Sequence, residues 1–211
     1  DKTGTLTEGS LMVESIHPQT DKAEFKKLIA SHLAGTDDNN STFQALKNYF
    51  PIGDAYNVTS TVPFSSERKW SSVTLEDGRT QVLGAPEKLC PQIPRDMEEQ
   101  MAQGKRILFV GLCSGTVTPD QIQPMGTIVI ADKLRKNAVP TIRYFYRQGV
   151  DVKVISGDNP LAASAVAKRS GIRGAERFVD ASRLTDAELE HAAERYTVFG
   201  RVTPEQKRVL I

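Results

Sequence analysis

Hydrophobic and polar residues alternate in the first part of this chain, and short continuous apolar runs replace the alternation in the last part. Alternation predicts strands with one buried face, whereas apolar residues three or four positions apart predict helices. In the first part, the expected strands cover residues 11–16, 58–62, 70–75, 80–83 and 107–112. Asp77-Gly78 between two of them predicts a β-hairpin, so we expect an antiparallel sheet with helices.

Three helices are expected beside these strands. The first lies between a Thr20 cap and Gly35, and its apolar residues recur at helical spacing: Phe25, Leu28, Ile29 and Leu33. The other two are expected around residues 45–50 and 95–103. His32 lies on the otherwise apolar first helix, so we interpret it as a packed or surface residue rather than a ligand.

From Thr127 onward, each continuously apolar strand is followed by a helix, which is typical of a buried parallel sheet. The expected strands cover residues 127–131, 152–155 and 197–199. One helix is expected to contain Val139, Ile142 and Phe145 and to end at Gly149, two more to start after residues 159 and 203, and a connecting helix to be capped at Thr185. Ligands bind at the carboxyl ends of strands in open α/β sheets. Ser156, Asp158 and Lys207 are therefore expected to converge on one crevice, and Asp1 to join them if a strand precedes it.

Composition narrows the possible functions. The chain has 27 Lys and Arg against 26 Asp and Glu, a net charge of +1, so no global field favours nucleic acid or an anionic membrane. Cys90 and Cys113 lack metal-binding spacing and fit a reducing compartment. No apolar run approaches the 18 or so residues of a membrane span, so the chain itself is not expected to cross a membrane.

The candidate chemistry begins with Asp1-Lys2-Thr3-Gly4-Thr5-Leu6-Thr7. A carboxylate, a lysine, alternate hydroxyls and a glycine are what a phosphate-handling turn needs: a nucleophile, a cation and free backbone N–H groups. The run is identical to the phosphorylation motif of the P-type ATPases, which pass through an aspartyl phosphate. That resemblance makes Asp1 the nucleophile.

Two further segments resemble the signatures of the P-type ATPase nucleotide-binding domain. Pro63-Phe64-Ser65-Ser66-Glu67-Arg68-Lys69 offers a ring that can stack on a purine and two cations for a triphosphate. Gly84-Ala85-Pro86-Glu87 is the second signature, and Arg106 matches a family arginine that reaches the nucleotide phosphates. The chain departs from the pattern at Leu83, where a lysine is expected, and at Ser66, where the calcium-pump branch usually has an arginine. We expect weaker ATP binding or a different pose.

The order of the remaining polar residues resembles the haloacid dehalogenase-type phosphotransferases, whose arrangement P-type ATPases share. The resemblance implies that Asp1 attacks the γ-phosphate of ATP while Mg²⁺ and Lys207 offset charge. It further implies roles for other residues. Phosphate would be bound by Thr3, Ser156, Gly157, Asp158 and Lys207. Mg²⁺ would be bound by Asp1 and the Thr3 carbonyl. The nucleotide would be bound by Phe64, Arg68, Lys69, Gly84, Ala85, Arg106, Asp132 and Arg135.

Two alternatives stay open. Soluble phosphatases of the superfamily usually carry a second aspartate two residues after the nucleophile as general acid and base, a role that Thr3 cannot take. A nucleotide-binding module without turnover is the other alternative, since the chain ends before the family's Gly-Asp-Gly-x-Asn-Asp motif, which completes the Mg²⁺ site. We therefore expect the isolated chain to bind nucleotide without catalysis.

The expected fold is α/β: an incomplete parallel sheet of haloacid dehalogenase type, with an inserted α+β nucleotide-binding domain. The expected domains are residues 1–10 and 125–211 for phosphorylation and 11–124 for nucleotide binding. The resemblance implies a parent cation pump at the cytoplasmic face of a bacterial plasma membrane. Its partners would be ATP, an actuator domain and an ion carried by membrane helices outside this chain. The segment 154–160 looks most like calcium and magnesium transporters, and the two nucleotide signatures disfavour the heavy-metal branch.

Overall fold

The computed structural model describes residues 1–51 and 53–211 and divides them into two compact units. Unit 1 contains residues 1–10, 102–104 and 132–211, and unit 2 contains residues 11–101 and 105–131. Each unit has its own sheet and its own hydrophobic core. The α/β fold expected from the sequence is confirmed, with one antiparallel and one parallel sheet.

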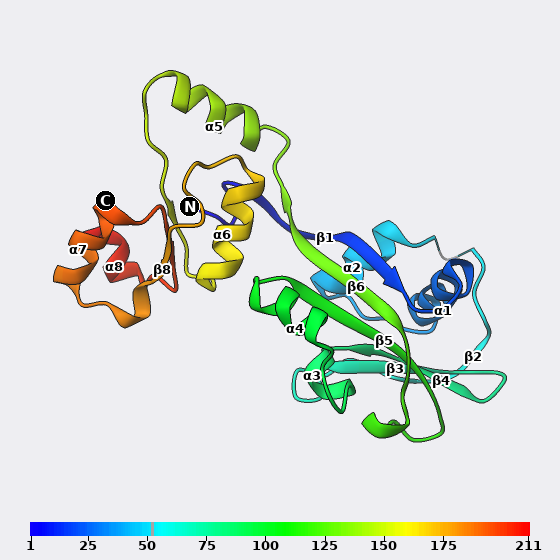
Figure 1. The fold of residues 1–211 in the computed structure, drawn as a ribbon. Coiled ribbons are helices and arrows are strands. Elements are labelled where there is room, and N and C mark those ends of the chain that lie inside the picture. Colours follow the sequence, from blue (N-terminus) through cyan, green and yellow to red (C-terminus); the bar gives the residue numbers. More distant parts are fainter. Residues whose placement is uncertain (52) are drawn as a thin grey trace. The chain divides into compact units, whose positions relative to one another are not determined.

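The larger sheet has six strands in the order β1-β6-β5-β4-β3-β2 (Figure 1). The strands are β1 (Thr7–Pro18), β2 (Val58–Val62), β3 (Trp70–Leu75), β4 (Arg79–Gly84), β5 (Arg106–Ser114) and β6 (Gln123–Leu134). From β2 to β6, neighbouring strands are antiparallel. The predicted hairpin joins β3 to β4, and Gly78 in its turn has a φ of 85°, which glycine adopts without steric cost.

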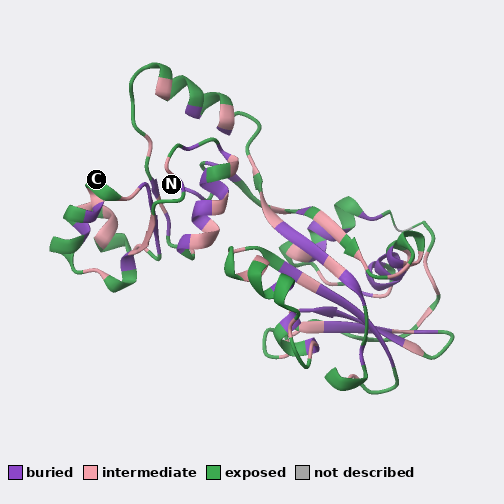
Figure 2. Ribbon diagram, in the orientation of Figure 1, coloured by how far each residue is buried: buried purple, intermediate pink, exposed green. Residues whose placement is uncertain are grey.

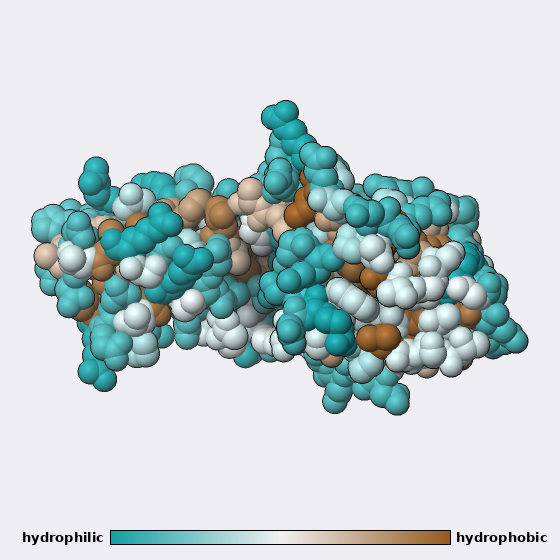
Figure 3. All heavy atoms as spheres, turned by 90° about the horizontal axis from the view of Figure 1, so that it is seen from below, coloured by the Kyte–Doolittle hydropathy of each residue, from teal (hydrophilic) through white to brown (hydrophobic). Residues whose placement is uncertain are grey.

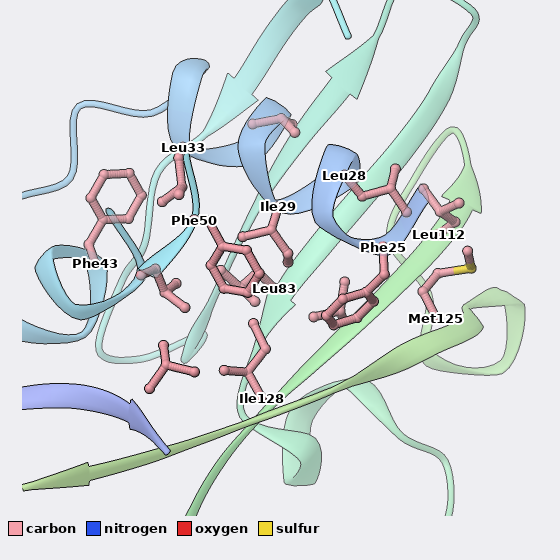
Figure 4. Close-up of a cluster of buried hydrophobic side chains, with 14 of the residues drawn as sticks. Phe25, Leu28, Ile29, Leu33, Phe43, Phe50, Leu83, Leu112, Met125 and Ile128 are labelled. Atoms are coloured by element: carbon pink, nitrogen blue, oxygen red, sulfur yellow. The ribbon is translucent and has the colours of Figure 1, made fainter. Parts of the chain in front are cut away.

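Helices cover both faces of this sheet. On one face, α1 (Lys22–Ala34) and α2 (Ser41–Tyr49) bury a continuous apolar core against the strands, shown in Figure 4. On the other face, α3 (Pro86–Leu89) and α4 (Arg95–Ala102) pack through Leu89 and Met97 against Val82 and Phe109. Buried residues accordingly follow the strands and the inner faces of the helices in Figure 2.

Three expectations for this region need correction. Residues 127–131 do not form a parallel strand, because β6 pairs antiparallel with β5 over Arg106↔Ile130 to Leu112↔Gln123. Both faces of β6 are buried there, and a central antiparallel strand then has the same continuous apolar run as a parallel one. The cap of α1 is Asp21 rather than Thr20, and its carboxylate accepts bonds from the first turn. The short helices α3 and η1 (Pro119–Gln121) were not expected.

Unit 1 is built on a three-stranded parallel sheet with the order β7-β9-β8. Its strands are β7 (Val154–Ile155), β8 (Phe178–Asp180) and β9 (Val198–Gly200). Val198 faces a core formed with α5 (Ala138–Arg147) and α6 (Pro160–Arg169), and Phe199 faces one formed with η2 (Ala181–Arg183), α7 (Asp186–Arg195) and α8 (Pro204–Val209). β8 was missed because three residues carry too little periodicity.

The predicted helix starts in unit 1 are confirmed. Asn159 caps α6, with Pro160 in its first turn. Thr185 and Thr203 form complete capping boxes with Glu188 and Gln206. No helix of the described residues is long and apolar enough to cross a membrane. Hydrophilic side chains dominate the face shown in Figure 3, with hydrophobic residues in separate patches.

Candidate functional site

Residues 1–7, called the Asp1 turn below, form a tight turn around the backbone carbonyl of Lys2. This oxygen accepts hydrogen bonds from the backbone N–H groups of Leu6 at 2.9 Å and Thr7 at 3.1 Å. Gly4 has a φ of 78°, so the turn uses the left-handed conformation that favours glycine. Asp1 Oδ1 accepts a bond from the backbone N–H of Lys2 at 3.0 Å. The turn therefore holds the Asp1 carboxylate at its entrance.

Asp1 and Lys207 lie together although 206 positions separate them in sequence. Lys207 Nζ lies 3.5 Å from Asp1 Oδ2, and both side chains are about half exposed, at 42% and 49%. The capping box at Thr203 fixes the start of α8. The position of Lys207, the fourth residue of this helix, is therefore set by the helix backbone. A carboxylate and an ammonium that solvent can reach suit a nucleophile and an anion ligand.

Ser156 and Gly157 follow β7, as the strand-to-helix pattern predicted. Ser156 is buried, and its Oγ accepts a bond from the backbone N–H of Asp158 at 3.1 Å. Its carbonyl accepts from Val202 N–H at 3.0 Å, and the Asp158 carbonyl accepts from Arg201 N–H at 2.7 Å. These bonds join the loop after β7 to the loop after β9, which leads into α8.

Asp132 and Asp158, predicted to contact nucleotide and phosphate, both direct their carboxylates to Lys2. Lys2 Nζ donates to Asp132 Oδ2 at 3.0 Å and is also paired with Asp158 Oδ2. Arg135, another predicted nucleotide ligand, donates from its backbone N–H to the Leu6 carbonyl at 3.0 Å. Its Nε donates to the Gly4 carbonyl at 3.1 Å. The loop after β6 is thus bonded to the Asp1 turn.

Sequence reasoning missed two residues that support these loops. Arg169 of α6 donates to the carbonyl of Asp132 at 3.0 Å. Arg201 donates to Asp180 Oδ2 at 2.9 Å, and the pKa of Asp180 is lowered, first by the Ser182 hydroxyl and amide and then by the charge of Arg201. No signal in the sequence joins residues so far apart, and only the position of Arg201 directly after a strand hinted at a role.

The two predicted nucleotide signatures adjoin in unit 2. The backbone N–H of Ala85 donates to the Lys69 carbonyl at 3.0 Å, and Gly84 pairs with Trp70 across the β3–β4 ladder. A Cβ on Gly84 would lie 2.4 Å from Trp70 Cβ and 2.5 Å from the Lys69 carbonyl oxygen. Only glycine therefore allows the two segments to approach this closely.

The predicted nucleotide ligands in the first signature differ in how free they are. Phe64 is 43% exposed, so its ring is open to a stacking partner. The Arg68 guanidinium contacts neighbouring residues of its own segment. It donates a hydrogen bond to the Pro63 carbonyl at 2.6 Å, and its Cζ lies 5.4 Å from the centroid of the Trp70 ring. Lys69 Nζ is paired with Glu87 Oε1 at 3.2 Å across the two signatures.

Leu83 and Arg106 occupy different environments. Leu83 is buried in the core beneath α1, opposite Val110, so its side chain belongs to the packing of unit 2. Arg106 is exposed at the start of β5, opposite Ile130. Within residues 1–51 and 53–211, no hydrogen bond or ion pair joins Arg106 to either signature.

Known proteins are similar to this chain over its whole length. The model of the haloacid dehalogenase-like hydrolases matches residues 1–211. A probable cation-transporting ATPase, exp7, of Streptococcus pneumoniae is 38% identical and is matched over 100% of this chain and 28% of its own length. The calcium-transporting ATPase CtpE of Mycobacterium bovis is 36% identical with the same coverage. The chain thus spans just over a quarter of these relatives.

Solved structures agree on the fold. A crystal structure of a zinc-transporting PIB-type ATPase covers 100% of this chain with a TM-score of 0.65 at 21% identity. This chain covers 33% of that structure. At this level of identity the likeness is one of fold, and it supports the two-sheet architecture described above.

Proposed function

Because the chain belongs to the haloacid dehalogenase-like hydrolase family, we propose that it is the nucleotide-binding and phosphorylation region of a membrane cation pump. The contact between Asp1 and Lys207, at 3.5 Å, is the observation that carries this proposal. It joins the first residue of the Asp1–Thr7 motif to the helix after the last strand of the parallel sheet. The relatives that match the whole chain are cation-transporting ATPases, which supports the same conclusion.

The proposed reaction is phosphoryl transfer from ATP to Asp1. An oxygen of the Asp1 carboxylate forms a bond to the γ-phosphorus, while the bond to the β–γ bridging oxygen breaks and ADP leaves with the electron pair. Lys207 offsets negative charge on the transferring group. The Ser156 hydroxyl, the Gly157 N–H and the Thr3 hydroxyl would donate to the phosphoryl oxygens.

Mg²⁺ fits the oxygen donors beside Asp1. The Asp1 carboxylate and the Thr3 carbonyl are hard oxygen ligands of the kind that Mg²⁺ prefers. Among the described residues, no group of three or more His, Cys, Asp or Glu side chains could hold a metal. Mg²⁺ would therefore complete its shell with water and phosphate oxygens, as it commonly does. When bound, it would offset charge on the phosphoryl group.

Unit 2 would bind the nucleotide. The exposed Phe64 ring would stack on adenine, with Gly84 and Ala85 forming the adjoining edge of the site. Lys69 would leave Glu87 to meet phosphate, and Arg68 and Arg106 would add positive charge. Leu83 stands where the resemblance leads us to expect a lysine, and its apolar side chain supplies no positive charge, so we expect weak ATP binding to the isolated chain.

Two observations separate this function from its rivals. A soluble phosphatase needs a general acid and base two residues after the nucleophile, and Thr3 has no group that titrates near neutral pH. Such a site leaves the aspartyl phosphate long-lived, which suits a pump. The relatives that match the whole chain are named cation-transporting ATPases, so we propose that turnover occurs in a protein of their length and that the 211-residue chain binds nucleotide without turnover.

The parent protein would be a bacterial membrane pump with these units on the cytoplasmic face, working with an actuator domain of the same chain. Ca²⁺ is the proposed cargo, because CtpE relatives are calcium-transporting ATPases. Phosphorylation of the full-length protein by ATP should then require Ca²⁺. Phosphorylation that depends on another cation instead would contradict this assignment.

The nucleophile is tested in the full-length protein. Asp1→Asn should abolish the ATP-dependent phosphoenzyme that hydroxylamine cleaves, whereas Asp151→Asn, at an exposed position before β7, should leave it intact. An undiminished phosphoenzyme in Asp1→Asn would exclude Asp1 as the nucleophile.

The nucleotide site is tested on the 211-residue chain by calorimetric titration with ATP, with and without Mg²⁺. Phe64→Ala should weaken binding by roughly 1–3 kcal/mol, the usual range for base stacking on an aromatic side chain. Phe145→Ala, which removes a similarly exposed ring from α5, is the control and should not change the affinity. Equal affinity in Phe64→Ala and wild type would remove Phe64 from the site.

A further inference from the structure

Lys2 has an environment unlike that of a phosphate ligand. Its side chain is only 5% exposed, and its ammonium lies between two carboxylates, Asp132 at 3.0 Å and the closely paired Asp158. Its charge is therefore already neutralised inside unit 1. Lys207, by contrast, is 42% exposed and, among the described residues, pairs with one carboxylate, that of Asp1.

The two carboxylates come from different elements. Asp132 lies near the end of β6 (Gln123–Leu134), and Asp158 lies in the loop between β7 and α6. The buried ammonium thus joins three segments that are far apart in sequence: the Asp1 turn, the end of β6 and the loop after β7. Removing one partner of a buried ion pair is costly because it leaves an uncompensated charge.

The contacts of Lys2 belong to a closed circuit, that is, a series of hydrogen bonds, ion pairs and chain connections that leads back to Lys2. Asp158 and Ser156 accept backbone bonds from Arg201 and Val202 at 2.7 and 3.0 Å. Val202 leads directly into the capping box of α8, which bears Lys207. Lys207 then returns to Asp1 at 3.5 Å. The backbone of Lys2 closes the circuit, since its N–H donates to Asp1 Oδ1 at 3.0 Å.

We propose that Lys2 is a positioning residue: its ammonium binds the end of β6, through Asp132, and the loop after β7, through Asp158, to the Asp1 turn, and so holds Ser156 and Gly157 in a fixed position relative to the nucleophile. This inference rests on the phosphoryl-transfer function proposed above. It gives the two lysines different roles: Lys207 binds the phosphoryl group, and Lys2 acts through the two aspartates. Asp158 accordingly contributes through its pairing with Lys2 rather than as a ligand of phosphate.

The test is a nitrogen-15 NMR spectrum of the 211-residue chain without ligand, in which the amide signals of Gly4 and Gly157 report the two loops. Lys2→Met should shift or broaden both signals, although Gly157 is distant in sequence. Lys168→Met, at an exposed position of α6, should leave both signals in place. An unchanged Gly157 signal in Lys2→Met would overturn the proposal.

Lys2→Met could prevent folding, so Asp158→Asn provides a milder variant that retains the Lys2 pair with Asp132. In Asp158→Asn the Gly4 signal should move, because the change reaches the Asp1 turn through Lys2. A Gly4 signal identical to wild type would count against the circuit. Adding Lys2→Met to Asp158→Asn should then shift Gly157 by less than Lys2→Met does alone, because the partner of Lys2 has already been removed.

A second titration separates this inference from the proposed function. In a titration with inorganic phosphate in the presence of Mg²⁺, Lys207→Met should abolish the phosphate-induced shift of the Gly4 signal. Asp158→Asn should raise the dissociation constant for phosphate about tenfold, as expected for the loss of one charge-assisted contact, here the pairing of Asp158 with Lys2. If the wild-type chain does not bind phosphate, the phosphoryl-transfer proposal loses support. The ligand-free spectra would still decide the role of Lys2.

Discussion

The largely apolar layer between α1 and its sheet also contains buried polar residues, among them His32, Ser71 and Gln81. His32 Nε2 and Ser71 Oγ are hydrogen-bonded at 2.8 Å, whereas Gln81 lies opposite Val73 and Leu112 on the same face. Among the described residues, both amide atoms of Gln81 lack a hydrogen-bond partner, although the side chain is fully buried. Burying an unpaired amide costs free energy, so these positions limit the stability of unit 2.

Replacing Gln81 with methionine should stabilise unit 2. The two side chains have similar volume, and the change removes two unpartnered polar atoms, so the free energy of unfolding should rise by about 1–3 kcal/mol. Urea denaturation measures the change, and Gln92→Met, at an exposed position, is the control. A loss of stability in Gln81→Met would mean that the amide has a partner such as an ordered water.

His32 should make stability depend on pH in the acidic range. Complete burial lowers the pKa of His32 from 6.5 to about 4. Between these values the unfolded chain binds a proton that the folded chain does not, so stability is full above pH 6.5 and falls as the pH drops toward 4. The loss is on the order of 3 kcal/mol.

The variant His32→Gln isolates this contribution, because its amide can still donate to Ser71 and does not titrate. Its denaturation midpoint should vary less between pH 6.5 and 4 than that of the wild type. Equal pH dependence in both proteins would assign the effect to carboxylates elsewhere in the chain.

At the scale of single residues, sequence reasoning predicted some of the contacts around Asp1 and missed others. Asp1 and Lys207 were expected to converge, and the structure brings them together. The partners of Lys2 could not be predicted, because Asp132 and Asp158 lie 130 and 156 positions away and their pairing depends on how β6 and the loop after β7 fold. Their functional roles remain predictions.

At the scale of elements, the β3–β4 hairpin joins the two segments predicted to bind nucleotide, and Gly84 sets their separation. Gly84→Ala should force the strands apart, since its Cβ would lie 2.5 Å from the Lys69 carbonyl oxygen. We expect a loss of about 1–3 kcal/mol in stability, as for overpacking, together with weaker ATP binding. Calorimetry and denaturation measure the two effects.

Gly78→Asn, in the turn of the same hairpin, is the control for Gly84→Ala. No atom of the residues that the structure describes lies within 4 Å of a Cβ at Gly78, and asparagine tolerates its left-handed conformation better than most residues. ATP binding should therefore persist. If Gly84→Ala also binds ATP as the wild type does, the signatures do not form one site.

Elements with strong local signals were predicted well, and elements defined by distant partners were not. The strands β2 and β3 have the predicted bounds, and the capping boxes of α7 and α8 follow from residues three positions apart. β6 was assigned to the wrong sheet because an apolar run does not reveal the direction of its neighbours. The short strand β8 depends on pairing with β9.

At the scale of the whole molecule, the two units have separate cores. Leu46 is buried in unit 2 and Leu189 in unit 1, at 1% and 0% exposure. Leu46→Ala should destabilise unit 2 by roughly 2–5 kcal/mol, and Leu189→Ala should do the same for unit 1. Hydrogen exchange should show faster opening of amides in the unit that carries the substitution. Equal acceleration in both units would mean that they unfold as one.

The different exposure of the two lysines beside Asp1 has a consequence for chemical labelling. Lys2 is shielded from solvent and held by two carboxylates, whereas Lys207 is open at the entrance to the Asp1 turn. A small amine-reactive reagent should therefore acylate Lys207 and spare Lys2 until the chain unfolds, as peptide mass spectrometry can determine. A covalent probe with an anionic recognition group would then attach at Lys207, within reach of the Asp1 carboxylate.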